Sequence, residues 1–337
     1  MSKTRFYNIP LFIPERACPF QCIFCDQRKI TGVLESLHVE EFKVIIEEHL
    51  STIPSNNTFV LVAFFGGTFT GIPIAEQEDY LKIVQPYIQN GAVKGIRIST
   101  RPDYINKENL ELLRRYNVTH IELGAQSLDD EVLLRSHRGH SYKDVVLASK
   151  MILDYNFTLG LQMMLGLPGD NEEKAISTAK KIISLGASET RIYPTMVIKG
   201  TSLARLYEKG KYTPLSTDKA VSISAKLLEI FEENNIKVLR VGLYASDELI
   251  NNDIIAGPKV EHFKERVLSY IWSNRFSELR NNTNINKSIT VFVPKKELNF
   301  AIGFEGKNKK MLLKYFSYVK IIADSNLSNR NYYVDYN

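Results

Sequence analysis

Apolar runs alternate with amphipathic stretches along the first two thirds of the chain. Short runs rich in aliphatic, aromatic and β-branched residues predict strands, and the stretches with apolar residues at helical spacing predict helices. The predicted strands cover residues 6–13, 59–65, 95–100, 119–123, 157–165 and 189–198, and the predicted helices cover residues 39–50, 74–89, 106–116 and 217–234. Because strands that alternate with helices form βα units around a parallel sheet, the pattern predicts an α/β fold.

Local signals refine where the helices begin and end. Pro86 interrupts or ends the second predicted helix, because proline cannot donate a backbone hydrogen bond. Ser127 followed by Asp130, and Asp170 followed by Glu173, have the spacing of a capping pair. Each pair therefore predicts the start of a further helix.

The pattern changes after about residue 240. An Asn-rich stretch at 249–258 predicts a loop, residues 261–276 predict a helix, and the polar stretch 280–287 predicts a linker. Smaller elements then follow, with strands at 288–293 and 318–323 and helices at 295–301 and 307–316. We therefore predict a core at residues 1–240, a helical extension and linker at 241–287, and a small α+β module at 288–337.

Composition is ordinary for a soluble globular protein, with 44% hydrophobic and 24% charged residues. No apolar run reaches the length of a membrane span, and the first residues lack the architecture of a signal peptide, so we expect no membrane partner. Free cysteines in a metal-binding loop need a reducing compartment, which predicts a cytoplasmic protein. The net charge of +5 is compatible with an anionic partner.

The three cysteines of the chain, Cys18, Cys22 and Cys25, lie within eight residues in a C-x3-C-x2-C pattern. Thiolates are the ligands of iron–sulfur clusters, and a fully ligated [4Fe–4S] cluster takes four of them. Three cysteines predict a cluster with one iron open to a small molecule. A structural zinc would need a fourth ligand, and the nearest histidine, His38, is far downstream. A disulfide framework does not suit the odd number of cysteines.

With Phe24 before the last cysteine, this loop resembles the signature of the radical SAM superfamily. The resemblance implies a partial (β/α)6 TIM-like barrel and a [4Fe–4S] cluster whose fourth iron binds S-adenosylmethionine (SAM). It also implies that an external electron donor, such as flavodoxin or ferredoxin, reduces the cluster. The reduced cluster then cleaves SAM to a 5′-deoxyadenosyl radical that abstracts hydrogen from a substrate.

Gly66, Gly67 and Thr68 follow the second predicted strand. A pair of glycines most often marks only a turn. Glycine also lets the backbone approach a ligand closely, and in the radical SAM family a Gly-Gly pair at this point binds the amino group of SAM. Thr68 stands where the family often has glutamate. We expect all three residues to bind the cofactor.

Further candidates end the other predicted strands, where ligands collect in parallel sheets. Arg101 is either one partner of a salt bridge at the strand end or a donor to the SAM carboxylate or ribose. The fifth strand ends in a turn that suits backbone contact with adenine, and Tyr193 ends the sixth as a candidate catalytic residue. The expected cofactor-binding residues are Phe24, Gly66, Gly67, Thr68, Thr100, Arg101, Gln126, Gly166, Leu167 and Pro168.

Six motifs support a narrower resemblance, which extends over about residues 8–225. They are Thr-Arg-Pro-Asp (100–103), Glu-Leu-Gly-Ala-Gln-Ser (122–127), Arg-Gly-His (138–140), Gln-Met-Met-Leu-Gly-Leu-Pro-Gly (162–169), Arg-Ile-Tyr-Pro-Thr-Met-Val-Ile-Lys-Gly-Thr (191–201) and Leu-Tyr-Glu-Lys-Gly-Lys-Tyr (206–212). In this order they resemble the radical SAM domain of the Elongator catalytic subunit family, which modifies the wobble uridine of tRNA with a group derived from acetyl-CoA. That family also has an acetyltransferase domain, and because no acetyl-CoA loop follows residue 240 we expect this chain to lack it.

The last predicted module contains Gly303 and Gly306 in a G-x-x-G loop between two helices. This arrangement resembles a minimal KH module (βααβ), whose loop clamps a nucleic-acid backbone. Residues 291–320 hold seven lysines and two glutamates, although one glutamate, Glu305, lies inside the loop. The alternative is a structural βααβ cap with a tight glycine turn. The expected RNA-binding residues are Gly303, Gly306, Lys307, Lys309 and Lys310.

Three functions remain open. The first is a radical SAM enzyme that modifies tRNA or another RNA. The second is a radical SAM enzyme that acts on a small molecule or protein, as the oxygen-independent coproporphyrinogen oxidases do. The third is a non-enzymatic iron–sulfur sensor that binds nucleic acid. Cleavage of SAM separates the third function from the first two, and co-purification of RNA separates the first from the second.

Overall fold

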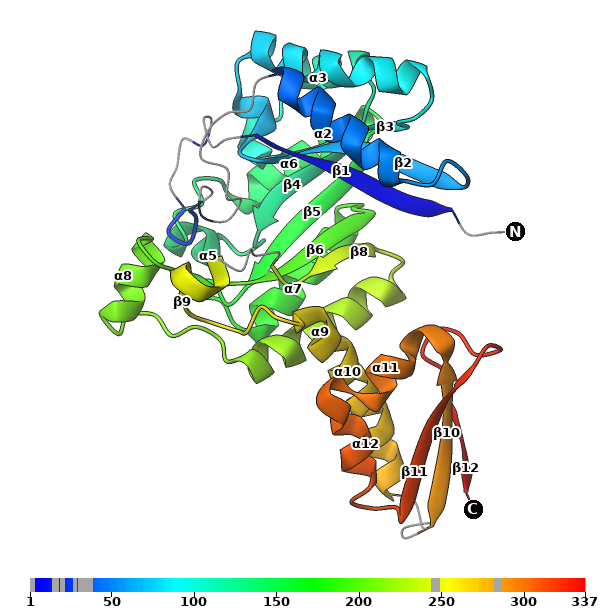
Figure 1. The fold of residues 1–337 in the computed structure, drawn as a ribbon. Coiled ribbons are helices and arrows are strands. Elements are labelled where there is room, and N and C mark those ends of the chain that lie inside the picture. Colours follow the sequence, from blue (N-terminus) through cyan, green and yellow to red (C-terminus); the bar gives the residue numbers. More distant parts are fainter. Residues whose placement is uncertain are drawn as a thin grey trace. The chain divides into compact units, whose positions relative to one another are not determined.

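The computed structural model describes residues 4–13, 18, 22–26, 29, 39–243, 249–281 and 287–336 (Figure 1). The chain divides into two compact units, Met1–Ser216 with Glu229–Pro258, and Thr217–Leu228 with Lys259–Asn337. The domain boundaries predicted at residues 240 and 287 stay a prediction, and the expected linker lies mostly outside the described residues. Within the described ranges, no helix combines the length and apolar character needed to cross a membrane.

The first unit is built on a parallel sheet in which strands that follow one another in the chain are neighbours. Its order is β1-β2-β3-β4-β5-β6-β8. The strands are β1 (Arg5–Ile13), β2 (Thr58–Gly66), β3 (Gly95–Thr100), β4 (Val118–Gln126), β5 (Thr158–Leu165), β6 (Glu189–Pro194) and β8 (Lys237–Val241). The predicted α/β fold with a partial TIM-like barrel is therefore confirmed, and β8 adds a strand that the sequence did not predict.

Helices connect these strands and cover one face of the sheet (Figure 1). They are α2 (Val39–Thr52), α3 (Ile74–Gln89), α4 (Lys107–Arg115), α5 (Asp130–Arg135), α6 (Tyr142–Asp154) and α7 (Glu172–Ser184). The short helix α8 (Ser202–Glu208) follows β6, and α9 (Thr217–Glu233) belongs to the second unit as far as Leu228. Contrary to the sequence prediction, α3 continues through Pro86 to Gln89. Two helix starts also differ slightly, because Asp129 caps α5 and Asn171 caps α7 through side-chain oxygens that accept backbone N–H groups.

The sixth predicted strand and the predicted loop after residue 248 differ from the structure in a related way. Strand β6 ends at Pro194, and residues beyond it form the separate strand β7 (Val197–Ile198). The Asn-rich stretch is a helical turn (Leu249–Asp253) followed by β9 (Ile254–Ala256), which pairs antiparallel with β7. The polar composition of this stretch predicted a loop. The short strand β9 is stabilised by pairing with β7, and such a strand has little strand-like pattern in its own sequence.

The sheet is strongly curved, and side chains from distant strands meet on its concave face. The guanidinium carbon of Arg191 on β6 lies 5.1 Å from the ring centre of Phe65 on β2. Lys237 Nζ on β8 lies 4.2 Å from the ring centre of Phe6 on β1. Because β1 and β8 are the two edges of the sheet, the second contact joins both edges near the starts of their strands. The result is a partial barrel whose edge strands come within side-chain contact at that end but do not pair.

The second unit is a three-stranded sheet packed against helices. The strands are β10 (Ser288–Pro294), β11 (Tyr318–Asp324) and β12 (Tyr333–Tyr336), in the order β11-β10-β12, with β10 parallel to β11 and antiparallel to β12. The helices are α10 (Phe263–Phe276), α11 (Leu298–Ile302) and α12 (Lys307–Leu312). The predicted βααβ order of the KH-like module is confirmed, with shorter helices than predicted and β12 as an additional strand. Trp272 and Phe276 of α10 are fully buried in its core.

Candidate active site

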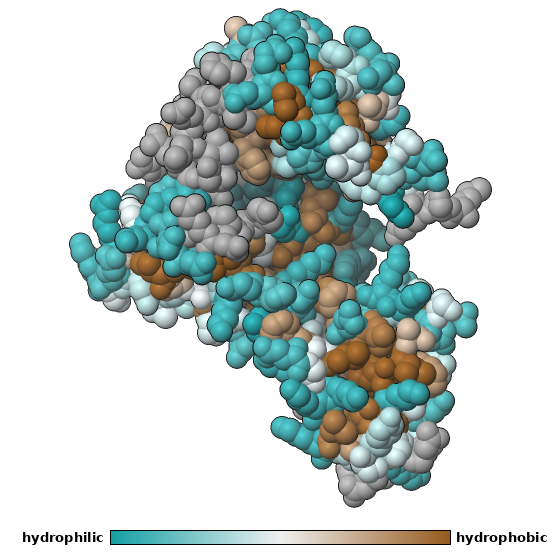
Figure 2. Space-filling view, in the orientation of Figure 1, coloured by the Kyte–Doolittle hydropathy of each residue, from teal (hydrophilic) through white to brown (hydrophobic). Residues whose placement is uncertain are grey.

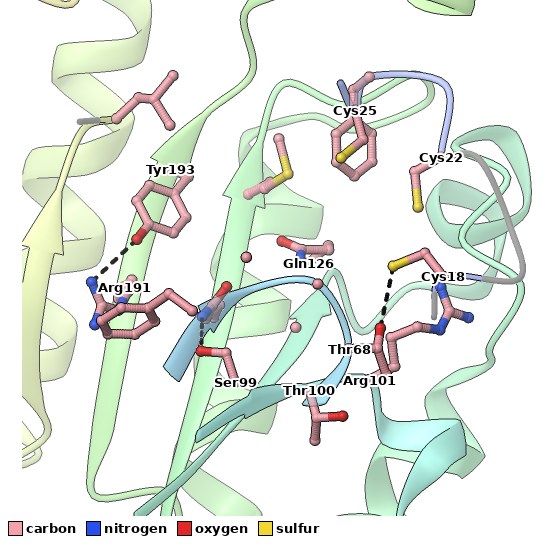
Figure 3. A pocket seen from close by; sticks show the side chains of 18 of the residues that line it. Cys18, Cys22, Cys25, Thr68, Ser99, Thr100, Arg101, Gln126, Arg191 and Tyr193 are labelled. Carbon is pink, nitrogen blue, oxygen red and sulfur yellow. Dashed lines mark hydrogen bonds between the residues drawn. The ribbon is translucent and has the colours of Figure 1, made fainter. Parts of the chain in front are cut away.

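A cavity of about 550 Å³ lies at the carboxyl ends of the barrel strands (Figure 3). It is lined by the three cysteines, by the turn after β2 and by the ends of β3 to β6. The predicted residues among its lining are Cys18, Cys22, Phe24, Cys25, Gly66, Gly67, Thr68, Thr100, Arg101, Gln126 and Tyr193. Residues far apart in the sequence are therefore brought together as the strand-end argument expected, while their individual roles stay predictions.

The turn at Gly166, Leu167 and Pro168 is not part of this lining. Leu167 is buried, and the Gly166 carbonyl accepts a hydrogen bond from the Tyr212 hydroxyl at 2.6 Å. A Cβ atom at Gly166 would lie 2.8 Å from Leu215 Cδ1, so packing alone explains the glycine. The predicted contact of this turn with adenine is therefore without support from the cavity.

The described part of the cysteine loop is held by backbone and side-chain contacts. Ile23 N–H donates to the Ser136 carbonyl at 3.2 Å, and the Ile23 carbonyl accepts from Leu203 N–H at 2.7 Å. Cys25 N–H donates to the Cys22 carbonyl at 3.0 Å, which forms a turn between these cysteines. The segments after α5 and at the start of α8 thus position the residue next to Cys22.

Downstream of the cysteines, Lys29 ties this loop to the segment after β6. Its Nζ donates to Asp253 Oδ1 at 2.7 Å and to the Lys199 carbonyl at 2.9 Å. Both partners belong to the β7–β9 region. The cysteine loop follows β1 at one edge of the barrel, and Lys29 attaches it to the β7–β9 region beyond β6, on the other side of the barrel.

The two glycines after β2 have different structural reasons. Gly66 has a φ of +112°, and a Cβ atom there would lie 2.3 Å from the carbonyl oxygen of Ile13. Close approach of β1 therefore requires glycine at position 66. Gly67 N–H donates to the same carbonyl at 3.3 Å, and Thr68 Oγ1 lies 3.2 Å from Cys18 Sγ. The turn thus joins β1, β2 and the first cysteine.

Arg101 forms a salt bridge at the strand end, which is one of the two roles predicted for it from the sequence. Its Nε and Nη2 donate to the two carboxylate oxygens of Asp103, both at 2.9 Å, and the side chain is 2% exposed. The same residue lines the cavity, so the carboxylate also fixes the plane of the guanidinium toward a ligand. Thr100 Oγ1 is bonded to Thr70 Oγ1 at 2.6 Å, which indicates a structural role for that hydroxyl.

Arg138 is a cavity residue that the sequence analysis did not assign to the site. Its Nη1 donates to Cys22 Sγ at 3.2 Å and its Nη2 to the Gly124 carbonyl at 2.7 Å. A Cβ atom at Gly124 would lie 2.8 Å from this Nη2, so glycine at position 124 makes room for the guanidinium. The signal was present in the Arg-Gly-His motif, but nothing in the sequence places that motif beside a cysteine.

Positive charge gathers near the cysteines. Burial, together with the charges of Arg138 and Arg101, lowers the pKa of His140 to about 3, so the ring is neutral at physiological pH. His140 Nε2 is bonded to the Ala125 carbonyl, at 3.3 Å. Because Asp103 already balances the charge of Arg101, it is the buried Arg138 guanidinium, bonded to Cys22 and to the Gly124 carbonyl, that favours an anionic ligand at this end of the cavity.

Arg191 lines the opposite end of the cavity and belongs to a network of buried charges that lies behind the lining (Figure 3). Glu122 pairs with Arg191 and, at 3.3 Å, with Arg97, and it accepts a hydrogen bond from Gln162 Nε2 at 2.6 Å. Arg97 also pairs with Glu189 at 2.7 Å. None of these contacts was predicted from the sequence, because each one links side chains on two different strands.

Tyr193 lies at the end of this network. Its hydroxyl accepts a hydrogen bond from Arg191 Nη1 at 3.3 Å. Burial raises the pKa of Tyr193, so the phenol is protonated at neutral pH. A protonated phenol in the cavity is a hydrogen-bond donor for a bound molecule.

Unsatisfied polar atoms indicate that the cavity suits a polar cofactor. Gln126 Oε1 and Arg138 Nε are buried without a hydrogen-bond partner in the part of the chain that the structure describes. Gln126 also has a φ of +63°, a strained backbone for a residue with a side chain, of the kind found at binding sites. Among the described residues, no three Cys, His, Asp or Glu side chains form a group arranged to hold a metal ion. The cysteines share the cavity with the unsatisfied atoms of Gln126 and Arg138, and the binding of a cluster by the three thiols stays a prediction.

Comparisons with known proteins agree with this geometry. The family model described as the radical SAM superfamily matches residues 12–182, and the one described as the Radical_SAM C-terminal domain matches residues 188–273. The tRNA uridine(34) acetyltransferase of Dehalococcoides mccartyi is 30% identical over 176 residues, which cover 46% of this chain and 38% of that protein. Elongator complex protein 3 of Saccharomyces cerevisiae is 29% identical over 203 residues, which cover 54% of this chain and 36% of that protein.

A solved structure shows the same fold. The archaeal Elp3 of Methanocaldococcus infernus, solved with an N-terminal deletion, matches with a TM-score of 0.66 and 20% identity, over 81% of this chain and 64% of that one. The resemblance to the Elongator catalytic subunit is therefore confirmed. The matched segments span little more than a third of the two curated relatives above.

Proposed function

The chain belongs to the radical SAM superfamily, and on that premise we propose that it binds a [4Fe–4S] cluster and SAM and modifies a base of tRNA. The observation that carries this proposal is the single cavity shared by Cys18, Cys22 and Cys25 with the glycine turn after β2. When bound, such a cluster supplies the electron that cleaves SAM to a radical able to abstract hydrogen. The clustering of all three cysteines in one motif of metal-ligand spacing favours a reducing, cytoplasmic location.

The residues of the chain divide the task between the two ends of the cavity. The three cysteines would hold the cluster, and Arg101 and Arg138 would neutralise the SAM carboxylate. Gly67 and Thr68 leave space for the methionine part of SAM beside Cys18. At the other end, Tyr193 would donate a hydrogen bond to the substrate, and the buried network behind it excludes water.

Loss of either arginine should weaken SAM binding. We expect Arg101→Ala and Arg138→Ala each to cost about 1.5–3 kcal/mol, the range for a hydrogen bond to a charged group, or roughly 10- to 150-fold in Kd. Equilibrium dialysis of SAM against the reconstituted proteins measures this. Arg135→Ala, on the exposed side of α5, is the matched control and should bind SAM normally. Normal affinity in both test variants would remove the arginines from the site.

Charge distribution supports RNA as the substrate. The second unit holds 16 basic and eight acidic residues, whereas the first holds 27 basic and 30 acidic ones. The whole positive surplus of the chain therefore lies on the unit with the KH-like module. Phosphate backbones bind such surfaces through release of counterions. Two of the matched relatives are named for modification of tRNA or for Elongator, which agrees with this assignment.

In the G-x-x-G loop the packing requires one of the glycines, and Glu305 places a negative charge beside the lysines. Gly303 has a φ of +91°, and a Cβ atom there would lie 2.6 Å from Asn308 N, so packing requires this glycine. Lys307 Nζ lies 3.7 Å from Glu305 Oε2, and Lys310 Nζ donates to the Glu305 carbonyl at 3.0 Å. Glu305 therefore competes with a phosphate for the lysines that we propose as RNA ligands.

We expect Glu305→Gln to tighten tRNA binding about two- to fivefold, because it frees a lysine for phosphate. Replacing Lys307, Lys309 and Lys310 with glutamine should weaken binding and make the slope of log K against log salt shallower by roughly 2. A salt titration of tRNA binding measures both. Glu278→Gln removes the same charge elsewhere in the unit and is the matched control. Equal effects of Glu305→Gln and Glu278→Gln would show only a long-range charge effect.

The substrate class is tested directly by incubating the reconstituted protein anaerobically with SAM, a reductant and total tRNA. Mass spectrometry of the digested nucleosides should show a SAM-dependent change in one nucleoside. SAM cleavage without any change in tRNA would contradict the RNA substrate and leave the radical chemistry intact. Absence of SAM cleavage would contradict the enzyme itself.

A further inference from the structure

Cleavage of SAM in the proposed function consumes one electron, which breaks the C–S bond and yields methionine and a carbon-centred radical. All three cysteines of this chain belong to the single motif at residues 18–25, so the chain has no thiolates for a second cluster that would relay the electron. We propose that the surface formed by α5, α8 and β9 docks an acidic one-electron carrier protein. This inference rests on the proposed function and adds a partner surface to it.

These three elements lie directly against the cysteine loop through Ile23. The residue is 3% exposed and its backbone is bonded on one side to Ser136, which follows α5, and on the other to Leu203 of α8. Its side chain packs in a cluster with Leu203 that Ala256 of β9 also contacts. Since Ile23 is next to Cys22, a protein bound to this surface is separated from the cluster site by one layer of residues.

Each of the three elements exposes one large apolar side chain. Leu134 on α5 is 77% exposed, and Tyr207 on α8 and Ile255 on β9 are each 38% exposed. Figure 2 shows apolar surface beside polar side chains in the region where Figure 1 places α8 and β9. Exposed apolar groups ringed by polar ones mark protein interaction sites.

Cations surround the same point. The segment from Lys199 to Lys211 also contains Arg205 and Lys209, all four exposed, against the single acidic residue Glu208. In the described part of the chain, none of these four side chains is in an ion pair. With α5, which adds Asp130, Glu131 and Arg135, the surface carries five basic and three acidic residues, whereas the unit as a whole has three more acidic than basic ones, so this is a local positive surface on a negative body. It complements an acidic partner.

The mixture of apolar and cationic side chains favours a protein over RNA at this surface. Interfaces with nucleic acid are more polar and more strongly charged than those with proteins. Redox partners meet through small, weak interfaces with apolar centres and charged rims. The densest positive charge of the chain lies on the other unit, where we place RNA.

The test compares two reductants on the reconstituted full chain. We expect the double variant Lys209→Glu, Lys211→Glu to raise the KM for reduced flavodoxin, an acidic flavin protein, by about tenfold or more at low salt. Its 5′-deoxyadenosine formation with dithionite, which needs no docking, should equal that of the wild type. The control variant Lys143→Glu, Lys180→Glu makes the same charge change on exposed positions of α6 and α7 and should keep the wild-type KM. A second variant, Leu134→Ser, should raise the KM without changing its salt dependence.

Each other outcome overturns the inference. Wild-type flavodoxin kinetics in both test variants would show that the carrier docks elsewhere. Reduced tRNA affinity with unchanged flavodoxin kinetics would assign the surface to RNA. Loss of the dithionite-driven rate would show that these side chains support the cysteine loop rather than a docked carrier, which also overturns the inference. If the wild type makes no 5′-deoxyadenosine with dithionite, the proposed function fails, and that result is distinct from a failure of docking alone.

Discussion

Replacing Cys22 with alanine should abolish both iron binding and SAM cleavage. Cys22 is the most buried cysteine of the loop and accepts a hydrogen bond from Arg138. With only three cysteines in the chain, its loss leaves two thiolates, too few to hold a cluster that already has one open iron. The expected wild-type content is about four irons per chain after anaerobic reconstitution.

Iron and sulfide analysis, visible absorption and 5′-deoxyadenosine formation measure this effect. Thermal unfolding of the apo proteins shows whether the variant still folds, and we expect its midpoint to stay near that of the wild type. Tetrahedral zinc without charge-transfer absorption in the purified wild type would contradict the cluster assignment. Retention of full iron by Cys22→Ala would contradict the role of this cysteine.

A second large effect is expected from Gly67→Val, which should eliminate SAM binding while leaving the cluster and the fold in place. Gly67 lines the cavity directly after β2. A β-branched side chain there would occupy the space between backbone and ligand. Isothermal titration with SAM and the visible spectrum of the cluster measure the two properties separately.

The neighbouring glycine provides a contrasting control. Gly66→Ala would place its Cβ 2.3 Å from the Ile13 carbonyl at a φ of +112°, so it should lower the unfolding midpoint of the whole unit. Gly67→Val should lower it much less. Normal SAM affinity in Gly67→Val, or equal destabilisation by both changes, would refute the assignment of position 67 to the ligand.

Most of the barrel could be predicted because its strands are buried on both faces. Residues 60–64 of β2 are all buried, and a strand that is buried on both faces has an unbroken run of apolar residues in its sequence. Strand β8 was missed because Lys237 and Arg240 interrupt its apolar residues. Its position at the edge of the sheet allows those charges, and edge position is a property of the fold that local sequence does not reveal.

The site residues that lie close together in the sequence could be predicted, whereas those that only the fold brings together could not. The cysteine spacing sits within eight residues, so the motif alone identified it. Arg138 acts on Cys22 across a sequence separation of 116 residues, and only the folded barrel brings them together. The turn at Gly166 was assigned to the cofactor by its glycine and proline, although in the structure the packing of Leu215 explains the glycine.

The buried pairs formed by Arg97, Glu122, Glu189 and Arg191 have an evolutionary consequence. Removing one member leaves its partner charged in a dry interior, at a cost of about 3–5 kcal/mol, a large part of the stability of a typical domain. A single substitution within this network therefore yields an unstable protein. Descendants of this protein can change Arg191, the member that lines the cavity, only together with a partner on another strand, so lining positions outside the network are where its lineage can diversify most freely.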